Sequence, residues 1–194
     1  SATSKIIVFL DNKVVYSNVI PLGGEHVTND ISKGLNISLE SAEHAKIVYG
    51  TLNLPFDEQI QLNSNEMKKR TVNKNILYGI IKPRYEEILE IIRDNIFDDI
   101  YARISIKSVI ITGGGSKIFG LCSLSKNILN KEVRIGSIVN KESFFYNKPE
   151  FSTILGLIKL AQENNKLEYS NELLKGSFFS AFDKLESWIE ESYA

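Results

Sequence analysis

One stretch of the sequence indicates the fold most directly, and it reads Val109-Ile110-Ile111-Thr112-Gly113-Gly114-Gly115-Ser116. Its apolar half is typical of a buried strand, and the glycines that follow lead into a helical pattern over 118–129. A second short apolar run at 133–135 predicts another strand. Together these segments predict a β-loop-α-β unit and therefore an α/β fold.

The three glycines also suggest a ligand-binding turn. Glycines between a strand and a helix let bare backbone approach a ligand, and the N-terminus of the helix adds a partial positive charge. Such a turn suits phosphate or ribose oxygens. The spacing, however, matches neither a P-loop nor the G-x-G-x-x-G fingerprint. A tight turn that serves packing alone is therefore an equal alternative.

The segments on either side add further helices and a hairpin. The hairpin is predicted because two β-rich runs flank the turn residues 11–13. Pro83 suits the first turn of a long helix, after which apolar residues recur at helical spacing up to Ile100. The predicted strands of the hairpin span 5–10 and 14–21, and the other predicted helices span 25–34, 39–49 with Ser38 as N-cap, 151–162 and 178–193.

A change of composition near the middle of the chain predicts an insertion. Residues 51–75 contain Pro55, scattered polar residues and two weak strand candidates, 59–62 and 67–72. We expect a small inserted α+β subdomain over 51–104, while 1–50 and 105–165 form the main subdomain. The remaining 166–194 hold a connector and a terminal helix, with polar connector sequence predicted over 163–176.

Length and composition exclude several classes of protein. The chain has 194 residues, with 43% hydrophobic and 24% charged, which argues against disorder. Its formal charge is -1, so no overall positive field draws it to nucleic acid. The longest apolar run, 6–10, is too short for a transmembrane helix. The single Cys122 favours a reducing, cytosolic setting. Because the chain opens at Ser1 without methionine, we expect a piece of a longer protein.

Two helical pairs of opposite charge are candidate binding groups. Glu43 and Lys46 lie three residues apart on one predicted helix, and Arg84 and Glu87 repeat that spacing on the long helix. Each pair could be an exposed salt bridge. The second could instead be a charged fork that reads a partner's carboxylate and amide groups.

A second glycine pair opens another predicted helix. Gly23 and Gly24 lead into polar residues that include Thr28 and Asp30, which could position a phosphate-bound Mg²⁺ ion or a water molecule. A simple turn is the alternative. Neither histidine nor Cys122 stands in a triad or a metal-ligand pattern, so we assign no catalytic residue and no metal site.

The predicted terminal helix is amphipathic. Its apolar arc includes Phe178, Phe182, Leu185, Trp188 and Ile189. Such a stripe could dock at a membrane surface or pack on its own domain. The polar face is acidic, whereas anionic lipid favours Lys and Arg.

Four motifs in series carry a resemblance to a known family. They are GG-x3-T-x-D-I at 23–31, AE-x2-K at 42–46, PR-x2-E at 83–87 and TGGG at 112–115. In this order the sequence resembles the bacterial cell-division FtsA family of actin-like ATPases over nearly the whole chain. The resemblance implies the second half of an actin-like, ribonuclease H-like ATPase fold, with a small inserted α+β subdomain.

The resemblance also implies roles for individual residues. ATP with Mg²⁺ is the expected cofactor of the intact protein, and the implied nucleotide residues are Thr3, Gly23, Gly24, Glu43, Lys46, Gly113, Gly114, Gly115 and Ser116. The implied partner is the C-terminal tail of the polymerising division protein FtsZ, gripped by Arg84 and Glu87 with Arg70 and Lys74 on the same surface. The terminal helix resembles the family's membrane-targeting helix.

The leading hypothesis is therefore an adaptor that recruits FtsZ to the inner face of the plasma membrane and self-associates into actin-like filaments. We expect little ATP turnover by these 194 residues alone, because an actin-like site positions its nucleotide between two domains. The alternatives are another actin-like ATPase, such as the rod-shape protein MreB or the pilus-assembly protein PilM, and a structural remnant that binds nothing.

Overall fold

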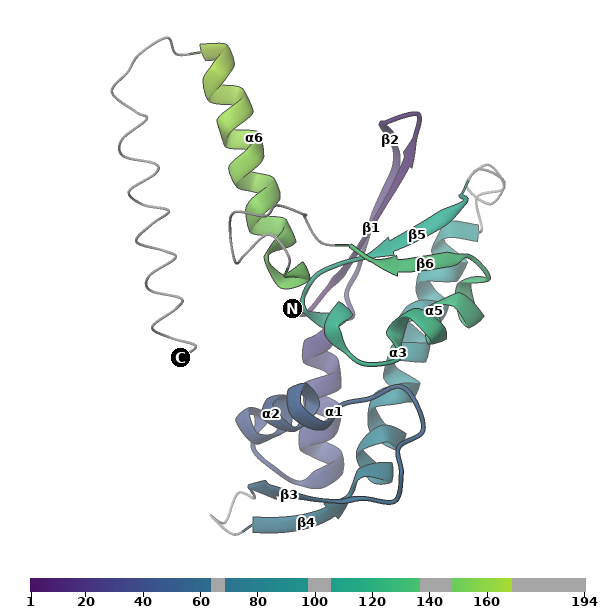
Figure 1. Cartoon of the computed structure of the whole chain (residues 1–194), viewed down its shortest axis with the longest axis vertical. Coiled ribbons are helices and arrows are strands. Elements are labelled where there is room, and N and C mark those ends of the chain that lie inside the picture. The colour runs from purple at the N-terminus through teal and green to yellow at the C-terminus, as the bar shows by residue number, and fades with distance from the viewer. Residues whose placement is uncertain (64–68, 98–105, 137–147, 169–194) are drawn as a thin grey trace. The chain divides into compact units, whose positions relative to one another are not determined.

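A computed structural model of the chain describes residues 1–63, 69–97, 106–136 and 148–168 (Figure 1). The chain divides into two compact units, Ser1–Thr153 and Ile154–Ala194. In chain order the elements are β1 (Ser4–Leu10), β2 (Lys13–Ile20), α1 (Gly24–Leu35), α2 (Leu39–Tyr49), β3 (Gln59–Asn63), β4 (Lys69–Asn73), α3 (Lys74–Phe97), β5 (Ser108–Ile111), the 3₁₀ turn η1 (Gly114–Lys117), α5 (Leu121–Leu129), β6 (Glu132–Ile135), the 3₁₀ turn η2 (Pro149–Phe151) and α6 (Ser152–Glu168).

The chain opens with the predicted hairpin. β1 and β2 pair antiparallel, and Leu10 stands opposite Lys13 across a two-residue turn. The turn residues Asp11 and Asn12 both have positive φ, 48° and 62°. Asp and Asn tolerate this left-handed region better than most residues, and such a turn matches the twist of the two strands. The sequence prediction of the hairpin is confirmed.

The glycine stretch lies where the sequence predicts it, between a strand and a helix. β5 and β6 pair in parallel, with Val109 opposite Val133, and α5 forms the connection between them. This confirms the β-loop-α-β unit. The helix, however, begins at Leu121 and not at 118. Residues 114–117 form a 3₁₀ turn, and Gly120 has a φ of 91°, which an α-helix does not contain.

Two hydrophobic clusters hold the first unit together. In the larger, fully buried side chains from α1 (Val27, Ile31) join others from α3 and from the β3–β4 pair. The smaller lies under the hairpin and contains Ile6, Val8, Ile20 and Ile96. Apolar residues four positions apart place their side chains on one helical face, which is why α1 and α3 bury a single stripe each.

The long helix α3 begins earlier than predicted. It starts at Lys74, so Pro83 lies inside it and not in its first turn. An interior proline removes one N–H and crowds the carbonyl four residues earlier, at a cost of about 3 kcal/mol. The helix continues because Leu77 and Ile81, which precede the proline, are completely buried. Burial of such a side chain contributes about 1.5–3 kcal/mol, so the two together outweigh the local cost.

The two weak strand candidates of the middle segment are strands. β3 and β4 pair antiparallel with Ile60 opposite Val72, which confirms their existence with bounds shifted by one or two residues. The subdomain boundaries at 51 and 104, and the separate part 166–194, stay predictions.

The last described helix is longer than predicted. α6 continues to Glu168, so the predicted polar connector is wrong over 163–168. Neither proline nor glycine occurs between 157 and 168, and polar side chains alone do not end a helix. The predicted helix 178–193 lies outside the described residues. None of the described helices combines the length and hydropathy needed to cross a bilayer.

Candidate nucleotide and partner sites

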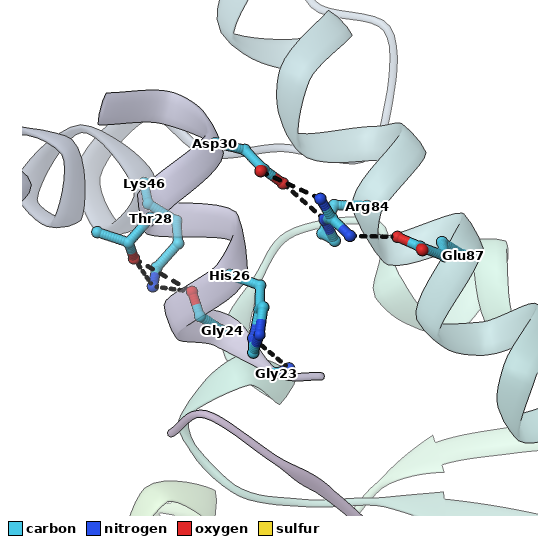
Figure 2. Close-up of polar contacts among 8 residues, drawn as sticks. All are labelled: Gly23, Gly24, His26, Thr28, Asp30, Lys46, Arg84 and Glu87. Atoms are coloured by element: carbon cyan, nitrogen blue, oxygen red, sulfur yellow. Dashed lines mark hydrogen bonds and ion pairs between the residues drawn. The ribbon is translucent and has the colours of Figure 1, made fainter. Parts of the chain in front are cut away.

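The glycine pair at the start of α1 lets the beginning of the chain pass close to this helix. A Cβ atom at Gly23 would lie 2.6 Å from the carbonyl oxygen of Ser1 and 2.9 Å from the backbone nitrogen of Thr3, so only glycine fits. The N–H of Glu25 donates to the Ser1 carbonyl at 3.1 Å. The N–H of Gly23 donates to Nδ1 of His26 at 3.3 Å, which caps the helix (Figure 2). Thr3, Gly23 and the first turn of α1 thus lie together.

A lysine on α2 ties that helix to the first turn of α1. Nζ of Lys46 donates to the Gly24 carbonyl at 3.0 Å and to the Thr28 hydroxyl at 2.8 Å (Figure 2). It also pairs with the Glu43 carboxylate at 2.6 Å, and the Thr28 hydroxyl contacts the same carboxylate. The Lys46 side chain is only 13% exposed. The pair is therefore more than the surface salt bridge that the sequence left open.

The network keeps Glu43 ionised. Burial raises the pKa of the Glu43 carboxyl, but hydrogen bonds from Lys46 and Thr28 and the charge of Lys46 outweigh it, and the pKa lies below its ordinary value. At neutral pH the carboxylate is an acceptor, and it is 46% exposed.

Glu43 and Lys46 border an open hollow between α1 and α2. Its volume is about 430 Å³, within the range of small-molecule sites. The lining residues are Ser1, then Glu25, Thr28 and Asn29 of α1, and Leu39, Glu40, Glu43 and Lys46 of α2. Carboxylates at the edge of such a hollow can accept hydrogen bonds from the hydroxyls of a sugar, whereas the three donors of the Lys46 ammonium are already used within the chain.

The triple-glycine turn is held from several sides. Gly113 has a φ of 91°, and its N–H donates to the Pro149 carbonyl at 3.0 Å. Ser116 is buried, and its hydroxyl donates to the Gly113 carbonyl at 2.7 Å, which closes the turn. A Cβ atom at Gly114 would lie 3.9 Å from the Cβ of Glu150. The hydroxyl of Ser116 is thus used within the turn.

Tyr85 of α3 contacts the triple-glycine turn, and the sequence reasoning missed it. Its hydroxyl donates to the Gly115 carbonyl at 3.1 Å, and the residue is 7% exposed. Burial, with a further contribution from the charge of Glu43, raises the pKa of Tyr85 to about 12. The Tyr85 hydroxyl therefore contacts the glycine turn directly, and the charge of Glu43 acts on it without a hydrogen bond between the two in the part of the chain that the structure describes. The four-residue spacing of Leu77, Ile81 and Tyr85 was the signal that could have found it.

The charged pair on α3 contacts α1. Nε and Nη2 of Arg84 donate to the two carboxylate oxygens of Asp30 at 2.6 and 3.1 Å, and Nη1 donates to Glu87 at 2.5 Å (Figure 2). The hydrogen bonds to Asp30 raise the pKa of the Arg84 guanidinium above its ordinary value despite partial burial. Arg84 is thus both a link between two helices and a partly exposed charge.

The other two predicted partner residues have separate contacts. Nη1 of Arg70 donates to the carbonyl of Leu35, the last residue of α1, at 2.6 Å. Nζ of Lys74 pairs with Glu58 at 2.9 Å. Lys74 precedes Arg84 by ten residues on α3, which corresponds to about 15 Å of helix. The four residues therefore do not form one cluster of hydrogen bonds, and their role in partner binding stays a prediction.

Two further predictions concern the membrane residues and metal sites. The membrane residues Phe178, Phe182, Leu185, Trp188 and Ile189 lie outside the described residues. Within the described part of the chain, no three His, Cys, Asp or Glu side chains gather as a metal site.

Comparison with known proteins identifies the family. Residues 1–156 match the family model described as cell division protein FtsA. The chain belongs to the FtsA family. The FtsA of Agrobacterium fabrum is 30% identical over 207 residues, which cover 98% of this chain and 46% of that protein. The FtsA of Rhizobium meliloti is 30% identical over 203 residues, with the same two coverages. The chain spans about half the length of the curated FtsA proteins it matches.

Solved structures confirm the fold expected for an FtsA-family chain. MreB5 of Spiroplasma citri bound to ADP has a TM-score of 0.67 at 17% identity, covering 87% of this chain and 53% of that one. A PilM-PilN type IV pilus biogenesis complex has a TM-score of 0.62 at 21% identity, covering 82% and 43%. These likenesses show part of the actin-like ATPase fold and nothing finer, so MreB and PilM gain no support as identities over FtsA.

Proposed function

We propose that the intact protein is an FtsA-type adaptor that binds the C-terminal tail of FtsZ and holds the division ring at the cytoplasmic membrane. The 194 residues correspond to about half of their curated relatives, so the proposal concerns a longer protein to which they contribute. We assign FtsZ binding to the α3 surface, and we assign membrane attachment to the predicted terminal helix. We further propose that the intact protein self-associates into actin-like filaments.

The observation that carries the proposal is the charged group on α3. Arg84 already holds one carboxylate through two parallel hydrogen bonds, the geometry in which a guanidinium recognises carboxylates. The side chain is 26% exposed, and Glu87, one turn later, is 47% exposed. A peptide that runs along α3 therefore meets a partly exposed guanidinium and a partly exposed carboxylate one helical turn apart.

The test is a titration of this chain with a synthetic FtsZ tail peptide. Arg84→Glu is expected to weaken binding at least tenfold, which is about 1.4 kcal/mol. Arg93→Glu is the matched control, because Arg93 lies on the same helix, is 39% exposed and pairs only with its neighbour Asp94 among the contacts described. Circular dichroism checks that each variant is folded, and Arg84→Gln repeats the test without adding a charge beside Asp30.

Two outcomes would count against the proposal. An Arg84→Gln titration curve that matches the wild type removes this surface as the binding site. Absence of any binding by the folded wild-type chain removes FtsZ as its partner.

We also propose that the intact protein binds ATP with Mg²⁺. The residues fit this group on one side. The hollow between α1 and α2 has the partly exposed Glu43 carboxylate as an acceptor and the Lys46 charge beside it, and the glycine turn offers backbone without side chains. Glu43 and Lys46 would hold the ribose, and Gly113 to Ser116 the adenine. Thr3, Gly23 and Gly24 would border the phosphates.

The chemistry of the nucleotide, when bound, is transfer of its γ-phosphoryl group to water. The residues of this chain bind and orient, since Lys46 fixes the two helices at the edge of the hollow and Tyr85 holds the glycine turn. We propose no catalytic residue among them. Transition-state stabilisation needs charges arranged on every side of the phosphoryl group, and we assign the remaining side to a second domain.

The location proposed is the inner face of the membrane at the division site. It is supported by family membership and by the apolar arc from Phe178 to Ile189 in the sequence. Insertion of such an arc at the headgroup boundary anchors a protein without spanning the bilayer.

A further inference from the structure

The guanidinium proposed to read a partner's carboxylate is already engaged by a carboxylate of this chain. Asp30 accepts from Nε and Nη2 of Arg84, and Glu87 accepts from Nη1 (Figure 2). An arginine has five N–H donors, and these contacts use three of them on all three nitrogens. The edge best suited to a bidentate ligand is the one that Asp30 occupies.

The charge of this group opposes a second acidic ligand. One positive and two negative side chains give Arg84, Asp30 and Glu87 a net charge of -1. A peptide carboxylate that approaches meets this net negative charge as long as both internal carboxylates remain. If Asp30 leaves the fork, the remaining pair is neutral and one bidentate edge is open.

Asp30 is placed so that it can leave. Its side chain is 29% exposed, so water can solvate the released carboxylate. The helix that carries it does not need to move, because the neighbouring Val27 and Ile31 are completely buried and hold α1 in the larger cluster. A change of the Asp30 rotamer is therefore sufficient.

We propose that Asp30 is an internal competitor for acidic peptides at Arg84. This inference rests on the proposed function. Binding of the partner exchanges one carboxylate for another in the same fork. The apparent affinity for the peptide is therefore the intrinsic affinity multiplied by the fraction of molecules in which Asp30 does not occupy Arg84. It also raises selectivity, because a peptide must offer a carboxylate that replaces the bidentate contact in order to displace it.

The experiment compares Asp30→Asn with Asp94→Asn in titrations of the whole 194-residue chain with an acidic FtsZ tail peptide at about 0.15 M salt. Asn keeps the shape of Asp and loses its charge. A partly exposed ion pair restrains Arg84 only modestly, so Asp30→Asn is expected to bind the peptide about twofold to fivefold more tightly than the wild type. Asp94 lies on α3 about 15 Å from Arg84, and the same loss of charge there is expected to leave the affinity unchanged.

A second measurement needs no variant and guards against an unfolded Asp30→Asn chain. In wild-type protein labelled with ¹³C, the side-chain carboxyl resonance of Asp30 is expected to shift as the peptide saturates its site, and that of Asp94 is expected to stay in place.

The outcomes separate the inference from the function on which it rests. Equal or weaker peptide binding by folded Asp30→Asn, or an Asp30 carboxyl resonance that does not move at saturation, overturns the competitor role and leaves FtsZ binding intact. If neither the wild type nor Asp30→Asn binds the peptide, the proposed function fails, and the competitor role with it.

Discussion

Replacing Lys46 with methionine tests the link between α1 and α2. Methionine keeps much of the length of the side chain and removes the ammonium group, which donates to the Gly24 carbonyl, the Thr28 hydroxyl and the Glu43 carboxylate. The variant therefore retains the packing of the stem and loses three hydrogen bonds at once.

The expected loss of stability follows from these contacts. Hydrogen bonds that involve a charged group contribute about 1.5–3 kcal/mol each when sheltered from water. The Lys46 side chain is 13% exposed, but its charged partner Glu43 is 46% exposed and regains hydration once the lysine is gone. The Thr28 hydroxyl also keeps a partner in the Gly24 carbonyl. We expect the free energy of unfolding at pH 7 to fall by about 1–2 kcal/mol.

The effect should depend on pH in a definite direction. Burial raises the pKa of Glu43, and the hydrogen bonds from Lys46 and Thr28 outweigh it, so the folded pKa lies below the ordinary value of 4.5. A carboxyl with a lowered folded pKa stabilises the protein above its unfolded pKa, and this stabilisation is lost as the pH falls through the folded pKa. The gap between wild type and Lys46→Met should therefore be largest at neutral pH and shrink below about pH 4.

Urea unfolding followed by circular dichroism at pH 7 and at acidic pH measures both quantities. Lys126→Met is the control, since Lys126 pairs at 2.7 Å with Glu132 but both side chains are more exposed, 45% and 79%. Its effect should stay within about 0.5 kcal/mol. A loss for Lys46→Met no larger than the control's, or a gap that does not change with pH, would refute the reasoning.

Three further predictions address the glycine turn and the terminal helix. Tyr85→Phe leaves the Gly115 carbonyl without its donor and should lower the free energy of unfolding by about 0.5–1.5 kcal/mol in urea; spectrophotometric titration should also lose the tyrosine with a pKa of about 12. Gly114→Asp should abolish ATP binding in a protein of full family length, because a charged side chain would fill the approach to the backbone, and retained affinity in a calorimetric titration would reduce the turn to a structural role. Deletion of residues 178–194 should release the chain from liposomes in a sedimentation assay, and a wild-type chain that never co-sediments contradicts the membrane proposal.

The elements that the sequence predicts well are those set by neighbouring residues. The hairpin follows from two turn residues that tolerate positive φ, and the β-loop-α-β unit from an apolar run that ends in glycines. Pro83 misled the prediction of α3 because the burial that carries the helix through it comes from distant segments. The start of α5 was missed because the sequence does not reveal that Gly120 has positive φ.

In the candidate sites, too, contacts between residues close in the sequence were predictable, and contacts between distant residues were not. The pair Glu43 and Lys46 could be read from helical spacing alone. The contact between Arg84 and Asp30 joins residues 54 positions apart, so no local pattern predicts that the fork is occupied. The hydroxyl of Tyr85 reaches a carbonyl 30 positions away and was equally invisible without the fold.

The side chain of Ile92 packs against both hydrophobic clusters. The hairpin and the helical part of the first unit therefore both pack on α3, and we expect the two parts to unfold together. Heating should unfold this unit in a single calorimetric peak, and a cavity made under the hairpin should lower the melting temperature of the helical part by the same amount.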